Sequence, residues 1–257
     1  MESARRFLSF IAVHKEAPLP AQSDHFAALG LGGFRPAASL NVFTDDVGQS
    51  ITDKNVHYSE LTGWYWIWKN VSNVAIIGLC HYRRYFFLHP SHRDFPFPKF
   101  WTNPTPDNLA ILTAPITADV VEEALTHATA IVPRRQNLNH SLARNYELCH
   151  SRDYWDVFIA AIRETCPELA GAVGLFDQTS ELYCYNMMIA RRPFFDDYMS
   201  KLFRVTDWME RAKAFPKEPY QCRVPAFVAE RFFTFYLQAT GVRVLEVPVV
   251  VLEPSGF

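Results

Sequence analysis

The feature that most constrains the fold is a helix-like segment followed closely by a buried strand. Across residues 55–69 large apolar side chains recur every three or four positions, which indicates a helix with one packed face: Leu61, Trp64, Tyr65 and Trp68. The apolar run at residues 74–79 indicates a strand covered on both sides, and residues 7–13 indicate an earlier strand. Strand, loop, helix and strand in this order favour an α/β fold with a mostly parallel central sheet flanked by helices.

The rest of the chain continues this alternation. We expect strands at residues 40–43, 128–132, 182–190 and 242–252, the last suited to a sheet edge because it contains Pro248. Helices are expected at residues 118–127, 141–149, 152–164, 193–214 and 224–240. Residues 16–39 are rich in proline and glycine and read as a loop, and the proline- and aromatic-rich residues 87–117 read as an insertion over the sheet. Because no linker is visible, we expect a single domain over residues 1–257.

Composition excludes several classes of protein. A net charge of −2 gives no electrostatic case for nucleic acid. The five cysteines are scattered and odd in number, which is typical of reduced thiols in the cytoplasm rather than of a disulfide framework or a zinc site. The apolar runs fall far short of the roughly 20 residues of a spanning helix, and the first of them is too short for a signal peptide. We therefore expect a cytoplasmic protein, with the aromatic residues 95–101 leaving contact with a membrane surface open.

A cationic and aromatic turn follows the strand at residues 74–79. It reads Cys80-His81-Tyr82-Arg83-Arg84-Tyr85. In open α/β sheets, ligands bind beyond the carboxyl ends of the strands. Two arginines and a histidine at such a place indicate an anionic ligand, and the tyrosines indicate a flat or sugar-like group beside it. The alternative is an exposed charged turn whose cations pair with acidic neighbours.

The sequence contains no clear metal-binding motif. Asp45 and Asp46 supply adjacent carboxylates, but two aspartates in such a segment usually serve turn chemistry, and we favour that interpretation. The histidines lack the H-x-x-x-H or H-E-x-x-H spacing of a zinc helix. The glycines at positions 30, 32 and 33 lack the strand-to-helix context of a phosphate-binding loop. The metal site is therefore left unassigned.

Several sequence blocks, in order along nearly the whole chain, carry a resemblance. The most specific is Ile77-Gly78-Leu79-Cys80-His81-Tyr82-Arg83-Arg84-Tyr85-Phe86, and others lie at residues 13–15, 46–55, 60–62, 65–70, 131–133, 185–189, 227–231 and 248–253. With these blocks the chain resembles the bacterial DUF4422 family of capsular polysaccharide and O-antigen (lipopolysaccharide) proteins. Some members of that family are assigned as glycosyltransferases, including galactofuranosyltransferases. The resemblance implies a GT-A-like nucleotide-sugar-binding fold.

The resemblance also implies where the donor substrate binds. In that fold a later strand ends in a turn that meets the diphosphate and usually carries Asp-x-Asp for a divalent metal. Here the turn has cations instead, so dependence on Mg²⁺ or Mn²⁺ stays open, and Arg83, Arg84 and His81 could replace the metal as an electrophilic clamp. The other residues that we expect at the donor are His14, Lys15, Asp53, Lys54 and Asn55. For these the alternatives are surface charge or, for Asp53 and Asn55, a helix cap.

Transfer with inversion needs a general base for the acceptor hydroxyl. Glu230 is the expected base because it lies near the start of a late helix, and His81 is the second catalytic candidate. A structural carboxylate paired with Arg231 or Arg223 is the alternative for Glu230. We expect Glu60, Tyr82, Tyr185 and Asn186 to line the sugar or acceptor site, since asparagine both donates and accepts hydrogen bonds with hydroxyls. For Glu60 the alternative is a favourable position at a helix N-terminus.

The sequence therefore predicts a cytoplasmic hexosyltransferase of bacterial surface polysaccharide synthesis, working at or near the inner face of the inner membrane. Its co-substrate is a UDP-sugar, with galactofuranose as the sugar that the resemblance suggests, and its acceptor is a growing glycan or a lipid-linked oligosaccharide. The alternative is a non-catalytic protein that binds nucleotide sugars or glycans on a degenerate GT-A scaffold. A glycoside hydrolase needs two carboxylates facing across a cleft, and no spacing here selects such a pair.

Overall fold

The computed structural model describes residues 5–89 and 95–253. Its core is a ten-stranded sheet in the order β11-β7-β10-β4-β1-β2-β3, with β5, β6 and β12 forming a branch that joins through β5 and β4. The strands of this sheet are β1 (Arg5–Val13), β2 (Phe26–Gly30), β3 (Asn41–Thr44), β4 (Val74–His81), β5 (Arg84–Phe86), β6 (Lys99–Thr102), β7 (Ala130–Pro133), β10 (Met188–Arg191), β11 (Val244–Val247) and β12 (Val249–Leu252). Strands β8 (Gln136–Asn137) and β9 (Glu181–Leu182) form a separate pair.

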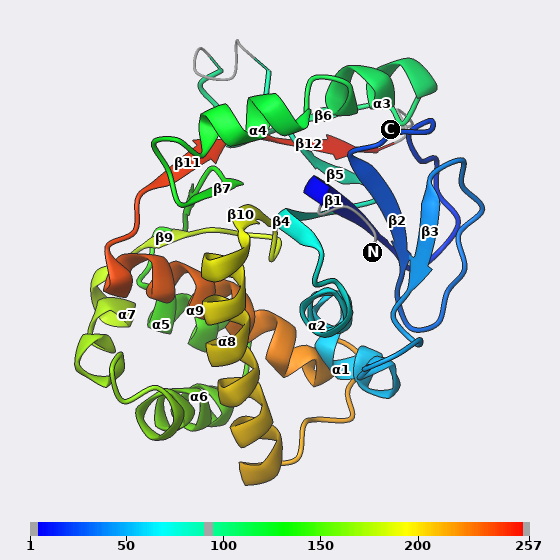
Figure 1. Ribbon diagram of the computed structural model, residues 1–257. Coiled ribbons are helices and arrows are strands. Elements are labelled where there is room, and N and C mark those ends of the chain that lie inside the picture. The colour runs from blue at the N-terminus through cyan, green and yellow to red at the C-terminus, as the bar shows by residue number, and fades with distance from the viewer. Residues whose placement is uncertain (1–4, 90–94, 254–257) are drawn as a thin grey trace.

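Helices cover both faces of the sheet (Figure 1). They are α1 (Asn55–Tyr58), α2 (Leu61–Asn70), α3 (Pro106–Thr113), α4 (Ala118–Ala124), α5 (Leu142–Cys149), α6 (Arg152–Thr165), α7 (Leu175–Gln178), α8 (Arg192–Ala212) and α9 (Val224–Thr240), with short 3-10 turns η1 (Thr52–Lys54), η3 (Ala170–Ala172) and η4 (Gln221–Arg223). Among the residues described, no helix is both long enough and apolar enough to cross a membrane.

Strand β1 shows how the sequence divides the core into two layers. Alternate side chains of a strand point to opposite faces. Leu8 and Phe10 therefore pack with α2 and with the helical layer of α5 to α9, whereas Phe7 and Ile11 pack with α3, α4 and the β5–β12 branch. Because both layers are apolar, the strand is buried almost throughout and shows no alternation in its sequence.

The predicted α/β architecture is confirmed, with one qualification about strand direction. Strands β4, β1, β2 and β3 are parallel to one another, as the strand–helix–strand order indicated. Strand β10, however, runs antiparallel to both β4 and β7, and β5 runs antiparallel to β4 and β12. The sheet is therefore mixed, with a parallel portion that carries the carboxyl ends of β1 and β4 at one edge.

Two predictions about local structure in the first half of the chain were wrong. Residues 16–39 were expected to be loop, yet β2 lies among them and is fully buried between β1 and β3. Its sequence, Phe-Ala-Ala-Leu-Gly, lacks the β-branched residues that mark most strands. The helix expected over residues 55–69 is broken at Ser59, whose φ of 49° is left-handed, so that α1 and α2 are separate.

Two expected strands in the second half are each divided. Residues 182–190 contain the end of β9, then an irregular turn, then β10. Residues 242–252 form β11 and β12, which are separated at Pro248. Although proline suggested an edge strand, β12 lies between β5 and β6, and the chain turns at Pro248 to reach that position. The Pro248 carbonyl accepts a hydrogen bond from the Phe87 amide, 2.9 Å away.

The insertion predicted over residues 87–117 contains β6 and α3, and its residues 90–94 lie outside the described part of the chain. Strand β6 is parallel to β12, so this segment joins the branch of the sheet. Thr105 caps α3 by accepting a hydrogen bond from the Asn108 amide, and Pro106 occupies the first turn, where a missing N–H is harmless. The exposed large apolar side chains of the segment are Phe97, Trp101 and Ile111.

Candidate functional site

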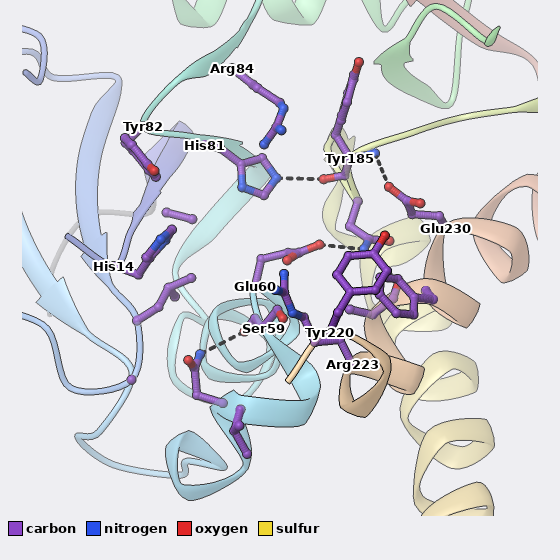
Figure 2. A pocket seen from close by; sticks show the side chains of 18 of the residues that line it. His14, Ser59, Glu60, His81, Tyr82, Arg84, Tyr185, Tyr220, Arg223 and Glu230 are labelled. Atoms are coloured by element: carbon purple, nitrogen blue, oxygen red, sulfur yellow. Dashed lines mark hydrogen bonds between the residues drawn. The ribbon is translucent and has the colours of Figure 1, made fainter. Parts of the chain in front are cut away.

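A cavity of about 1070 Å³ lies beyond the carboxyl ends of β1 and β4, bounded on its other side by η4 and the start of α9 (Figure 2). Ten of the thirteen predicted site residues line it: His14, Asn55, Glu60, His81, Tyr82, Arg83, Arg84, Tyr185, Asn186 and Glu230. They come from six separate segments between β1 and α9, so tertiary packing assembles the pocket. Their assembly in one cavity is consistent with the predicted roles, which stay predictions.

A left-handed turn at Tyr185 and Asn186 forms the centre of the site. Their φ angles are 80° and 48°, values that are unfavourable for residues with a Cβ and that need support from neighbours. The Tyr185 amide donates to Glu230 Oε1 at 2.6 Å, and the Tyr185 carbonyl accepts from His81 Nε2 at 2.7 Å. The Asn186 carbonyl accepts from Trp64 Nε1 at 2.8 Å. Pocket and core side chains thus hold the turn in place.

The turn also fixes the chemistry of His81. Because a carbonyl oxygen can only accept, Nε2 must carry the proton, and Nδ1 of the neutral ring is left as an acceptor. Burial lowers the pKa of His81 to about 4, and the nearby Arg84 acts in the same direction. The ring is therefore neutral near pH 7. In this neutral form His81 offers Nδ1 as a hydrogen-bond acceptor rather than a positive charge, and its place in the clamp stays a prediction.

Two carboxylates, Glu60 and Glu230, lie in the pocket with only partial exposure to solvent. Burial raises the pKa of both carboxyls, and the Arg84 guanidinium partly offsets this by lowering the pKa of each. Glu60 Oε1 accepts from Asn186 Nδ2 at 2.7 Å, and it makes no capping bond to α2. Glu230 Oε2 forms an ion pair with Arg231 Nη1 at 3.4 Å, so one of the two partners named in the structural alternative for this carboxylate is present. Both groups therefore suit proton transfer better than ordinary surface carboxylates do.

Besides Arg231, which pairs with Glu230, three arginines line the same pocket: Arg83, Arg84 and Arg223. Within the described part of the chain, none of them has a carboxylate within ion-pair distance. The Arg84 guanidinium lies 4.9 Å from the centre of the Tyr185 ring, and that of Arg83 lies 5.8 Å from the Tyr82 ring. The alternative that these cations are neutralised by acidic neighbours is thus not what the structure shows.

Asp45 supports the floor of the pocket from below. This fully buried carboxylate accepts from the amides of Gly32 and Gly33, both at 3.1 Å, and from the hydroxyls of Thr52 at 2.8 Å and Thr62 at 2.6 Å. Gly32 and Gly33 have φ of 62° and 75°, which explains why glycine is required at this loop. Asp45 therefore has the structural role that the sequence favoured over metal binding. It is, however, fully buried rather than exposed in a surface turn.

Three predicted donor residues lie away from the pocket lining. Lys54 Nζ pairs with Glu210 Oε2 at 2.8 Å, and the Tyr58 hydroxyl donates to the same oxygen at 3.0 Å, so Lys54 joins η1 to α8. Asp53 is exposed within η1, and Lys15 is exposed beyond β1. Asn55 does line the cavity, but its amide is used to hold the break between helices, donating to the Ser59 carbonyl and the Thr62 hydroxyl.

Sequence reasoning missed the wall that η4 and α9 build. His150, Tyr220, Arg223 and Phe227 all line the cavity. Residues 215–220 have neither helical nor strand periodicity, and His150 stands one residue beyond α5, so no local pattern marked these residues as neighbours. The only available signal was the concentration of aromatic and basic residues just before α9, which on its own does not distinguish a binding wall from a surface loop.

Comparison with known proteins identifies the family. A sequence profile described as "Domain of unknown function (DUF4422)" matches residues 9–241. The chain belongs to the DUF4422 family. A solved structure described as the apo form of WbbM, a bifunctional glycosyltransferase, superposes on it with a TM-score of 0.85 and 22% sequence identity. The superposition covers 98% of this chain but only 46% of WbbM, and no protein of curated function matches the chain. At this identity the likeness shows that this DUF4422 chain has the fold of a glycosyltransferase structure.

Proposed function

We propose that this DUF4422 protein is a glycosyltransferase that moves a sugar from a UDP-sugar donor to a glycan or lipid-linked acceptor. The observation that carries the proposal is a single pocket lined both by Arg83, Arg84 and Arg223, which have no carboxylate at ion-pair distance among the described residues, and by two partly buried carboxylates with raised pKa. The shared fold and the family resemblance support it. Galactofuranose is the proposed donor sugar, and bacterial surface polysaccharide is the proposed product class.

The arginines would stabilise the leaving group. In the reaction, the acceptor oxygen forms a bond to the anomeric carbon while the bond from that carbon to the β-phosphate oxygen breaks, and its electron pair leaves with UDP. Guanidinium groups bind phosphate through paired hydrogen bonds and stabilise such developing charge, which makes Arg83 and Arg84 the proposed clamp. Their position beyond β4 is where open α/β sheets bind ligands.

Glu230 is the proposed base. It would take the proton of the acceptor hydroxyl as the new bond forms, and attack from the side opposite UDP would invert the anomeric centre. The Tyr185 amide holds Oε1 of this carboxylate at 2.6 Å, while Oε2 has the longer contact of 3.4 Å with Arg231, and we assign Oε2 to the acceptor hydroxyl. Glu60 is anchored by Asn186, and we assign it to binding a sugar hydroxyl. His81 Nδ1 supplies a further acceptor for substrate hydroxyls.

The donor set does not fit the divalent ion that this fold commonly uses. The turn after β4 offers Arg83 and Arg84 where carboxylates would be required. Within the described residues no three of His, Cys, Asp and Glu gather as metal ligands, and Asp45 is consumed by four hydrogen bonds inside the protein. We therefore derive no step through a metal ion.

We propose that the enzyme meets its acceptor at a membrane surface. A lipid-linked acceptor stays in the membrane, so the enzyme must work close to it. Phe97, Trp101 and Ile111 expose 62%, 56% and 59% of their surface, and large apolar side chains of this kind suit contact with lipid headgroups. We propose the cytoplasmic face of the inner membrane as the place of work.

UDP release measures the proposed activity. Purified protein would be incubated with UDP-galactofuranose and other UDP-sugars, with and without a saccharide panel. We expect acceptor-dependent UDP release by the wild type, a loss of at least 100-fold in kcat for Glu230→Gln with UDP affinity unchanged, and at least tenfold weaker UDP binding for Arg84→Ala. Arg6→Ala, which changes an arginine on the outer surface, serves as the control. UDP binding without turnover on any donor and acceptor would instead establish a nucleotide-sugar-binding protein.

A further inference from the structure

The pocket has a second wall whose character differs from that of the arginine side. In Figure 2, Tyr220 and Arg223 lie at one side of the pocket and Arg84 at the other, with Glu60 between them. Tyr220 lines the cavity and is 51% exposed, so its ring is open to a ligand. Three aromatic rings, those of His150, Tyr220 and Phe227, make up this wall, and we call them the aromatic platform.

The rings of the platform are packed against one another. His150 and Phe227 are stacked, with ring centres 3.9 Å apart and an interplanar angle of 20°. The Tyr220 ring lies 5.1 Å from Phe227 and 6.1 Å from His150, and it is nearly parallel to the imidazole at 26°. Such stacking holds each ring in one orientation, so a flat ligand meets a surface that needs little rearrangement.

Hydrogen bonds fix the platform to the rest of the protein. The Glu218 carboxylate accepts from the Tyr220 amide at 3.1 Å, and it also accepts from the Gln221 amide. Gln221 Nε2 donates to the Cys149 carbonyl at 3.1 Å, which directs Oε1 toward His150 Nδ1, also at 3.1 Å. His150 Nδ1 must therefore donate, and Nε2 is left as an acceptor. This network ties η4 to the end of α5.

The chemistry of this wall matches a sugar ring better than a phosphate. Burial lowers the pKa of His150 to about 4, so the ring is neutral near pH 7. Of the two arginines on this side, Arg231 pairs with Glu230 at 3.4 Å, whereas Arg223 is exposed. An exposed aromatic face packs against the C–H face of a sugar, while Nε2 of His150 and the guanidinium of Arg223 accept from and donate to hydroxyls. The diphosphate, in contrast, is assigned to the two adjacent cations Arg83 and Arg84.

We propose that the aromatic platform is the subsite for an uncharged sugar ring of the acceptor, which packs on Tyr220. This inference rests on the proposed function, because it is the acceptor of that reaction that the platform receives. The pocket, at about 1070 Å³, lies at the upper end of the usual range for ligand sites, and in this proposal it receives donor and acceptor together. The acceptor then approaches from the η4 side, and Glu230 at α9 lies on that same side.

Binding measurements that need no turnover test the platform. Ligand-observed NMR would follow octyl β-D-galactopyranoside, octyl β-D-glucopyranoside and octyl N-acetyl-β-D-glucosaminide in the presence of UDP, and calorimetry would follow UDP alone. For Tyr220→Ala we expect at least tenfold weaker binding of the saccharide that the wild type prefers, with the Kd for UDP within twofold. Tyr220→Phe should keep most of the saccharide affinity, because it retains the ring. Leu148→Ala is the control, since Leu148 is 53% exposed on α5 and does not line the pocket.

Two results would overturn the proposal. If Tyr220→Ala weakens UDP at least fivefold and leaves the saccharide unaffected, the platform stacks the uracil ring of the donor. If no saccharide of the panel binds to the wild type, the platform is not a sugar subsite. A failure of the proposed function would give a different result. UDP release would be absent with every donor, while saccharide binding and its dependence on Tyr220 would be unchanged.

Discussion

Replacing Asp45 by asparagine should destabilise the protein far more than the same substitution at its exposed neighbour, Asp46. Each oxygen of the carboxylate accepts from one backbone amide and one threonine hydroxyl: Oδ1 from Gly33 and Thr52, Oδ2 from Gly32 and Thr62. An asparagine amide has only one accepting oxygen, so its NH₂ group must face one of the two glycine amides. A threonine hydroxyl can turn round and accept, but a backbone N–H cannot.

The expected loss follows from the bonds removed. A hydrogen bond to a charged group contributes about 1.5–3 kcal/mol, and a buried donor left without a partner adds a penalty of similar size. Asp45→Asn should therefore lower the free energy of unfolding by about 3 kcal/mol, which is a large share of the roughly 5–15 kcal/mol of an ordinary domain. Because Gly32 and Gly33 line the pocket, the affinity for UDP should fall as well.

Urea denaturation followed by tryptophan fluorescence measures this loss. Asp46→Asn is the matched control, because Asp46 is exposed and pairs with Arg35 at 2.9 Å on the surface, so its removal should change stability by no more than about 0.5 kcal/mol. Equal stability of Asp45→Asn and wild type would refute the reasoning. So would stabilisation of the wild type by Mg²⁺ or Mn²⁺ that both variants abolish, since that would make the two aspartates a metal site.

Three further predictions concern stability. The lowered pKa of His150, about 4 against 6.5 when unfolded, makes the unfolded chain bind more protons between pH 4 and 6.5; stability is therefore lost as pH falls through this window. Between pH 7 and 4.5, urea titrations should show a smaller loss in the free energy of unfolding for His150→Gln than for wild type, by about 1 kcal/mol after solvent screening of the half-buried ring; identical pH profiles would contradict this. Gly78→Ala should cost about 1–3 kcal/mol, since a Cβ would lie 2.7 Å from Ser9 Oγ and 3.0 Å from Ile189; a thermal melt like that of wild type would disprove it. Lys54→Met should lower stability by about 1 kcal/mol through loss of its bond to Glu210, yet leave the calorimetric Kd for UDP unchanged; weaker UDP binding would restore Lys54 to the donor site.

The sequence was most informative at the end of β4, where one segment predicts both a strand and the ligand-binding residues that follow it. The apolar run before His81 predicted β4, and the rule that ligands bind beyond such strands placed Arg83 and Arg84 in the pocket. The carboxylate at position 230 was found by its place near the start of a late helix. These predictions needed only the order of elements and the chemistry of the side chains.

Other features depended on contacts that no local pattern records. Strand β2, Phe-Ala-Ala-Leu-Gly, is buried on both faces and contains no β-branched residue, so it lacked a strand signal. The left-handed φ angles at Tyr185 and Asn186 are supported by hydrogen bonds from distant segments rather than by glycine. Lys54 was misplaced for a similar reason, since its partner Glu210 lies 156 positions further along the chain.

The turn at Tyr185 and Asn186 has a consequence for how the protein can change. Its backbone is held by His81 from β4, Trp64 from α2 and Glu230 from α9, so three distant segments must already be in place before the turn can exist. No fragment of the chain that lacks any of them would keep the pocket's geometry. Ligand affinity should therefore report on completed folding. Homologues with a different specificity are expected to differ at the pocket walls and to keep this hydrogen-bonded turn.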